Sequence, residues 1–128
     1  MKNVKVLFTL SGIVQKHLRR GTKLGYPTAN MKVYMNAPDG IFVGYVTLDS
    51  TRYQAIIFIG KPLTFDEYDK KAEVYILDFE RDIYGTHIDV TVLEKLRDNQ
   101  KFDSHELLIK QMQKDEIQAR EFFSTINK

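Results

Sequence analysis

Hydrophobic and polar residues alternate with a period of two along most of the chain, up to about residue 99. The clearest case is residues 87–96, where Ile88, Val90 and Val92 alternate with polar side chains, as expected for a strand with one buried face. Runs rich in Val, Ile, Tyr, Phe and Thr, separated by turn residues, predict further strands. The expected strands cover residues 4–14, 41–48, 52–59, 73–79 and 87–96. We expect turns between them at residues 48–51 and, around Gly85, at 82–86.

The period becomes helical after residue 103. Apolar residues recur at helical spacing at Leu108, Met112, Ala119, Phe123 and Ile126. Asp103 or Ser104 can cap this helix, and Asp103 with Glu106 resembles a capping box. Asp115 interrupts the apolar stripe, which leaves a kink or two successive helices open. Antiparallel strands followed by one helical segment predict a mainly β single domain, residues 1–128: a small barrel with the helix outside it or over one end.

Composition narrows the classes of function. The 128 residues are 43% hydrophobic and 28% charged, which is typical of a folded globular domain and excludes a disordered chain. No cysteine is present, so disulfides and thiolate metal sites are impossible and a cytoplasmic location is favoured. The net charge of +2 gives no argument for a nucleic-acid or membrane partner, and no apolar stretch is long enough to span a bilayer.

The most unusual segment is residues 21–30, GTKLGYPTAN. Its glycines would let the backbone approach a phosphate, and its lysine would neutralise phosphate charge. Thr28 and Asn30 are two residues apart, so in an extended chain their oxygens lie on one face and are suited to a hard cation such as Mg²⁺. The spacing of a Walker A loop is absent. From composition alone, a solvated loop that binds nothing is the simpler interpretation.

Two charged residues further along the chain are also candidates. Glu73 begins the segment EVYILDF and shares a face with Tyr75 and Leu77. It is either at an exposed strand end or half-buried, where desolvation would make it a better proton acceptor. Arg97 either contacts an anionic ligand or lies on a solvated loop. The three histidines are scattered along the chain, so we do not expect a zinc site.

Several segments together resemble the riboflavin kinase family, in the family's order from about residue 11 to residue 123. The most specific is LGYPTAN at residues 24–30, followed by PDGIF at 38–42 and IG at 59–60. EVYILDF at 73–79, DIYG at 82–85, LR at 96–97 and KFDS at 101–104 continue the series. Departures from the pattern common in bacterial members fall at His17, Thr22, Phe58 and Leu63.

The resemblance implies a six-stranded antiparallel Greek-key β-barrel with a C-terminal α-helix. It also implies an ATP-dependent kinase that transfers the γ-phosphate to the 5′-hydroxyl of riboflavin, giving FMN and ADP. By position, Glu73 would be the catalytic base, while Thr28 and Asn30 would bind Mg²⁺. The nucleotide-binding residues would be Gly21, Lys23, Gly25, Pro27, Thr28 and Asn30. The flavin-binding residues would be Arg97, Phe102 and Leu107.

The same resemblance sets expectations about partners. ATP or ADP and riboflavin or FMN are the expected small-molecule ligands, without a nucleic-acid or membrane partner. Bacterial members usually carry an FMN adenylyltransferase domain before the kinase domain, and we do not expect that domain here. We expect a monomer. The alternative is a catalytically idle barrel that only binds flavin or nucleotide, although such a protein would need no base at position 73. A nucleic-acid-binding barrel would need a basic stripe, which the sequence lacks.

Overall fold

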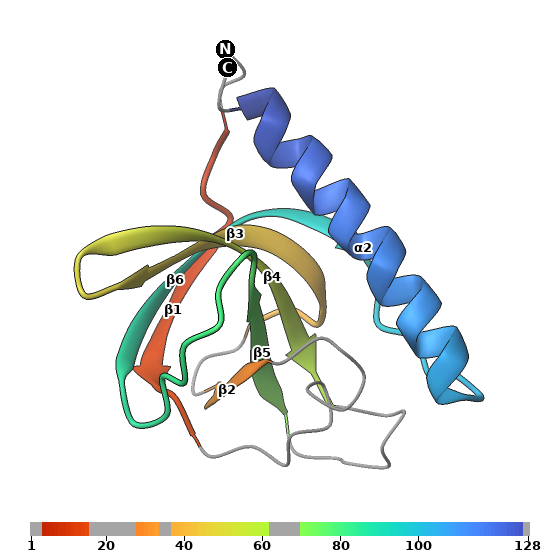
Figure 1. Cartoon of the computed structure of the whole chain (residues 1–128), viewed down its shortest axis with the longest axis horizontal. Helices are drawn as coiled ribbons and strands as arrows, with labels where there is room; N and C mark the ends of the chain where they lie inside the picture. The colour runs from red at the N-terminus through yellow and green to blue at the C-terminus, as the bar shows by residue number, and fades with distance from the viewer. Residues whose placement is uncertain (1–3, 16–27, 34–36, 62–69, 127–128) are drawn as a thin grey trace.

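The computed structural model describes residues 4–15, 28–33, 37–61 and 70–126, and it consists of six strands and a C-terminal helix (Figure 1). The elements follow one another as β1 (Phe8–Ile13), β2 (Ala29–Lys32), β3 (Gly40–Leu48), β4 (Thr51–Gly60), β5 (Lys71–Ile76), β6 (His87–Arg97) and α2 (His105–Ile126). The expected mainly β class with a C-terminal helix is therefore confirmed.

The strands form one antiparallel sheet in the order β1-β6-β3-β4-β5-β2. The neighbours β6-β3-β4-β5 place the last of four successive strands beside the first, which is the Greek-key arrangement. The sheet curls until its two edge strands approach each other (Figure 1). There the backbone N–H of Gln15 donates to the carbonyl of Asn30 at 2.7 Å. The expected six-stranded barrel is thus confirmed, with its edges joined beside the segment that contains Asn30.

Both expected turns are present. Asp49 and Ser50 have φ of 51° and 66°, and they connect β3 and β4 where Leu48 faces Thr51. Positive φ at both central residues is the type I′ geometry, which matches the twist of the flanking strands. In the second turn, the Tyr84 N–H donates to Asp82 Oδ1 at 3.0 Å, and Gly85 has a φ of 81°.

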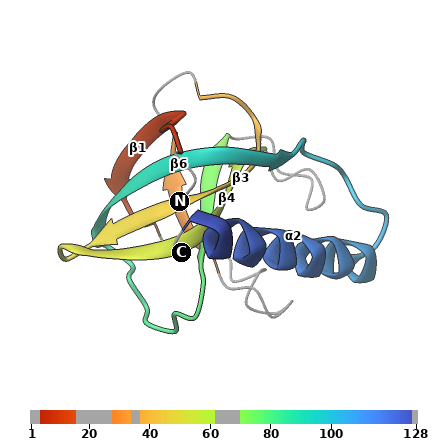
Figure 2. The same ribbon diagram turned by 90° about the horizontal axis from the view of Figure 1, so that it is seen from above.

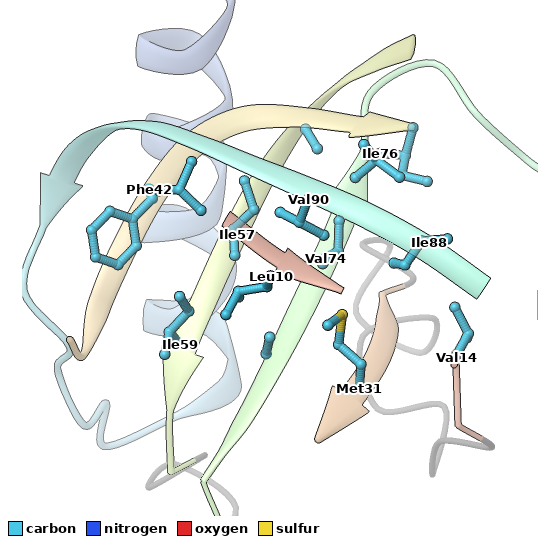
Figure 3. Packing of buried hydrophobic residues seen from close by; sticks show 14 of the residues in the cluster. Leu10, Val14, Met31, Phe42, Ile57, Ile59, Val74, Ile76, Ile88 and Val90 are labelled. Atoms are coloured by element: carbon cyan, nitrogen blue, oxygen red, sulfur yellow. The ribbon is translucent and has the colours of Figure 1, made fainter. Parts of the chain in front are cut away.

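Side chains pack in two layers, one inside the barrel and one between its wall and α2. The interior is filled by alternate residues of all six strands, including Leu10, Met31, Phe42, Val74 and Val90 (Figure 3). A second cluster joins Ile41, Val43, Ile56, Leu77 and Leu93 to Ala119, Phe122 and Phe123 of α2. The helix therefore lies along the outside of the barrel (Figure 2). Of the predicted stripe, Met112, Ala119 and Phe123 are buried, and Phe122, which the spacing did not predict, is buried with them.

The structure differs from expectation at β2 and at the end of β5. A strand, β2, occupies Ala29–Lys32, at the end of a segment that the sequence placed in neither a strand nor a helix; pairing with β5 imposes it. The strand predicted at 73–79 ends at Ile76, because Asp78 has a φ of 56° and a strand cannot continue through that geometry.

The C-terminal helix is continuous through Asp115, so neither the kink nor a second helix is present. Ser104 caps it: its Oγ accepts the Leu107 N–H at 3.2 Å. Of the two cap candidates the structure thus selects Ser104.

Candidate active site

Three candidate residues from distant parts of the chain lie on one row across the outer face of the sheet. Asn30 of β2 pairs with Glu73 of β5, and Glu73 pairs with Phe58 of β4. Phe58 then pairs with Ile41 of β3, and Ile41 pairs with Arg97 of β6. Directly opposed residues of antiparallel strands point to the same face. The register therefore places Asn30 beside Glu73. Arg97 lies three strands from Glu73, which is roughly 14 Å along the sheet at ~4.8 Å per strand.

The Asn30 end of this row is rich in oxygen atoms. Thr28 Oγ1 lies 3.4 Å from Asn30 Oδ1, and the Asn30 residue is only 9% exposed. The backbone of Asn30 is held on both sides, by β5 and by the Gln15 N–H. The backbone of Asn30 therefore keeps a fixed place next to that of Glu73.

Glu73 is half-buried within β5 and is not at its end. Its neighbours Ala72 and Val74 point into the barrel, whereas Tyr75 on its own face packs against the cluster beneath α2. Of the two alternatives left by the sequence, the half-buried one is confirmed. Burial, followed by the nearby Glu116 carboxylate, raises the pKa of Tyr75. Tyr75 therefore remains a neutral phenol to a higher pH than an ordinary tyrosine does.

At the other end of the row, Arg97 is paired with a helix residue. Its Nε and Nη2 donate to Oδ1 and Oδ2 of Asp115, both at 2.8 Å. Gln111 Nε2 donates to Asp115 Oδ1 at 3.0 Å. Asp115 is 0% exposed, and sequence reasoning treated it only as an interruption of the helical stripe. A carboxylate at a buried stripe position does signal a buried cationic partner, which is the clue that could have found this pair.

The segment after β6 carries the other flavin-side candidates. Arg97 Nη1 donates to the Asp98 carbonyl at 3.1 Å, and the guanidinium lies 5.9 Å from the centre of the half-buried Phe102 ring. Leu107, in the first turn of α2, is 47% exposed. Phe102 and Leu107 therefore flank the start of the helix on the Arg97 side of the row.

Asn99, which sequence reasoning did not single out, ties the same segment to β4. Its Nδ2 donates to the Ile59 carbonyl at 2.9 Å. The next residue, Gly60, has a φ of 147°, and a Cβ there would lie 2.2 Å from Asn99 Nδ2. Only glycine allows this approach.

A cavity of about 500 Å³ opens near the Asn30 end of the row. It is lined by Gly12, Ile13, Val14, Gln15, Lys32, Tyr84 and Gly85. Gln15 and Lys32 are near neighbours of Asn30 through the barrel seam and through β2, and the Tyr84 ring is exposed. The cavity therefore offers a cation, Lys32, and the exposed Tyr84 ring, and two of its lining residues, Gln15 and Lys32, are near neighbours of Asn30.

The remaining nucleotide-side candidates, Gly21, Lys23, Gly25 and Pro27, lie outside the described residues, as do His17, Thr22 and Leu63. In the described segments, no three His, Asp or Glu side chains gather into a metal-binding cluster. No helix among those segments is long and apolar enough to cross a membrane.

The fold is thus a six-stranded antiparallel barrel whose outer face carries Asn30 and Glu73 side by side and Arg97 at the far end of the same row. Residues 4–123 match the family described as riboflavin kinase (flavokinase). The chain belongs to the riboflavin kinase family.

Curated relatives agree with this assignment. The trifunctional protein RibF/MnmA of Mycoplasmoides gallisepticum is 39% identical over 91% of this chain, and the RNA-binding riboflavin kinase RibR of Bacillus subtilis is 36% identical over 83% of it. The bifunctional riboflavin kinase/FMN adenylyltransferase of Listeria monocytogenes is 34% identical over 93% of the chain. This chain covers 18%, 47% and 39% of their respective lengths, so it spans less than half of each.

Two solved structures share the fold. The macrolide-efflux protein from Streptococcus pneumoniae superposes with a TM-score of 0.77 at 37% identity, over 88% of this chain and 38% of its own. The riboflavin kinase from Trypanosoma brucei has a TM-score of 0.62 at 21% identity, over 91% of this chain and 79% of its own. The second comparison shows likeness of fold alone.

Proposed function

We propose that this chain transfers the γ-phosphate of ATP to the 5′-hydroxyl of riboflavin, giving FMN and ADP. The observation that carries the proposal is the register of β2, β5 and β4, which opposes Asn30 to Glu73 and Glu73 to Phe58 in a chain of the riboflavin kinase family. Phosphoryl transfer requires positioning and charge stabilisation rather than covalent participation by the protein. A metal-binding pair of oxygens directly beside a carboxylate meets that requirement.

Thr28 and Asn30 fit a Mg²⁺ ion carried by the nucleotide phosphates. Both side chains offer an uncharged oxygen, the donor type that Mg²⁺ accepts, and the two oxygens lie 3.4 Å apart, so one ion could contact both. Two neutral ligands hold Mg²⁺ weakly by themselves, so the phosphates must supply the remaining charge. The ion, when bound, would neutralise charge that develops on the transferred phosphoryl group.

Glu73 is the group that would accept the proton of the ribityl 5′-hydroxyl. Its strand holds it beside Asn30, so a hydroxyl at Glu73 lies next to the phosphates that the metal binds. Phe58, its other cross-strand neighbour, packs against the apolar cluster beneath α2 and limits the access of water to the carboxylate.

The two substrates would approach from opposite ends of the row. The cavity beside Tyr84 and Lys32 favours the nucleotide at the Asn30 end, where Gly21, Lys23, Gly25 and Pro27 are expected to contribute. Arg97, Phe102 and Leu107 would receive the flavin at the other end. An extended five-carbon ribityl chain spans roughly 6 Å, which carries the ring past Phe58 toward Arg97.

The direct test is to incubate the purified chain with riboflavin, ATP and Mg²⁺ and to separate the products by chromatography. We expect stoichiometric FMN and ADP, and no FMN when Mg²⁺ is chelated. Binding of riboflavin without any FMN would instead support the idle-barrel alternative. A cytoplasmic location and a monomeric state remain predictions.

A further inference from the structure

We propose that Asp115 is a positioning residue for the flavin half of the site. By holding Arg97, it fixes the segment between β6 and α2 against which the riboflavin ring would rest. The inference rests on the proposed function, and it assigns a role to a buried carboxylate that phosphoryl transfer itself does not use.

The contacts of Asp115 orient Arg97 rather than merely neutralise it. The two nitrogens Nε and Nη2 of the guanidinium meet the two carboxylate oxygens at 2.8 Å each, and Gln111 adds a third bond at 3.0 Å. A two-point contact between planar groups fixes the plane of the arginine as well as its distance. The Arg97 side chain is 18% exposed and that of Asp115 is 0% exposed, so water competes little for either partner.

Helix docking alone does not require this pair. Met112, Ala119, Phe122 and Phe123 already bury an apolar stripe of α2. Taking two charges out of water costs about as much as their attraction returns, and well-packed apolar replacements of buried ion pairs are often neutral or stabilising. A role in binding therefore accounts for the pair better than a role in stability.

What Arg97 holds is the flavin side of the site. The guanidinium binds the Asp98 carbonyl and lies over the Phe102 ring. Asn99 anchors the same segment to the Ile59 carbonyl, one residue beyond Phe58 on β4. The orientation of Arg97 is thus transmitted to Phe102 and to the backbone that approaches the row containing Glu73.

A second arginine–carboxylate pair on the same helix provides a matched control. Arg120 donates to both oxygens of Asp78, with Nη1 at 3.1 Å and Nη2 at 2.9 Å. This pair also ties α2 to the barrel, but it is exposed and lies beyond the end of β5. Its loss removes a comparable contact without disturbing Arg97.

The experiment compares steady-state kinetics of five chains: the parent, Asp115→Asn, Arg97→Met/Asp115→Leu, Arg97→Lys, and the control Asp78→Asn. Asp115→Asn keeps Arg97 and weakens only the contact that orients it, so a rise of several-fold in its riboflavin KM reports positioning rather than a lost flavin contact. In the double variant we expect the riboflavin KM to rise about ten-fold or more, which is the usual effect of losing a charge-assisted contact. We expect the ATP KM and kcat to stay within about three-fold, because Asn30 and Glu73 are untouched. Asp78→Asn should leave all three constants near those of the parent.

Circular dichroism shows which variants are folded. If the double variant is unfolded, Asp115→Asn decides, because it keeps Arg97 but weakens the two-point contact and should raise the riboflavin KM several-fold. A folded variant whose riboflavin KM stays within two-fold of the parent overturns the inference and leaves the pair a structural one. If the parent chain forms no FMN, the proposed function fails instead, which the parent's own assay shows.

Discussion

Replacing Glu73 with Gln removes the proposed base and preserves the shape of the side chain. The backbone of residue 73 is held in ladders on both sides, by Asn30 and by Phe58, so the substitution has little room to move the strand. We expect a stability change within about 0.5 kcal/mol, as for a half-exposed position without a special geometry. Losing a general base costs about 10²- to 10⁴-fold in kcat, or about 2.7–5.5 kcal/mol in the activation barrier.

The assay is FMN formation at saturating riboflavin and MgATP, with binding of each substrate measured separately by fluorescence and calorimetry. Glu73→Gln should keep both affinities within a few-fold, while kcat falls by roughly the 10²- to 10⁴-fold typical of losing a general base. Glu73→Asp is the matched control: it keeps a carboxylate but withdraws it by one methylene, so its activity should be intermediate. A kcat within a few-fold of the parent in Glu73→Gln would refute the assignment of the base.

Three further predictions test the other parts of the molecule. Thr28→Ala and Asn30→Ala should weaken Mg-ATP binding far more than riboflavin binding, and unchanged Mg-ATP affinity by calorimetry in both variants would remove them from the metal site. Gly60→Ala should lower the unfolding temperature, because its φ of 147° and its approach to Asn99 exclude a Cβ; an unchanged midpoint would contradict the close contact. The hydrogen bond from Arg120, followed by its positive charge, lowers the pKa of Asp78 below its ordinary 3.8. Its stabilising contribution is therefore present above pH 3.8 and lost as the pH falls through the folded-state pKa, so the parent should unfold at a slightly higher temperature than Asp78→Asn at pH 6 and at the same temperature near pH 2.

The sequence pattern was sufficient to predict those strands and turns whose own residues determine their structure. The alternation of Ile88, Val90 and Val92 is matched by their complete burial, and the Asp49–Ser50 turn uses residue types that tolerate positive φ. The strand β2 could not be predicted in this way. Its four residues, ANMK, have no strong β propensity, and they are extended because β5 and Gln15 supply their hydrogen-bond partners.

In the candidate site too, the residue types could be read from the sequence but their contacts could not. The residue types at positions 28, 30 and 73 suggest their chemistry. Asn30 and Glu73 are 43 positions apart in the sequence, however, and only the pairing of β2 with β5 brings them together. The Arg97–Asp115 pair joins a strand end to the middle of a helix, and no periodicity encodes that contact. A carboxylate within an apolar stripe was therefore interpreted as an interruption, whereas it is where the helix and the β6 end are joined.

The row from Asn30 to Arg97 also explains why a barrel suits this reaction. Adjacent strands are held at a fixed spacing by ladder hydrogen bonds, so neighbouring positions on one face act as fixed points at multiples of ~4.8 Å. In the proposed reaction, the reacting oxygen needs its base and its phosphate within one such step, which Asn30 and Glu73 would provide. The flavin ring needs a separate anchor beyond the length of the ribityl chain, which Arg97 would provide from the far side of Phe58. Because the strands set these distances, the segments that follow them need only enclose the substrates, and the Arg97–Asp115 and Asn99–Ile59 contacts hold one of those segments in place.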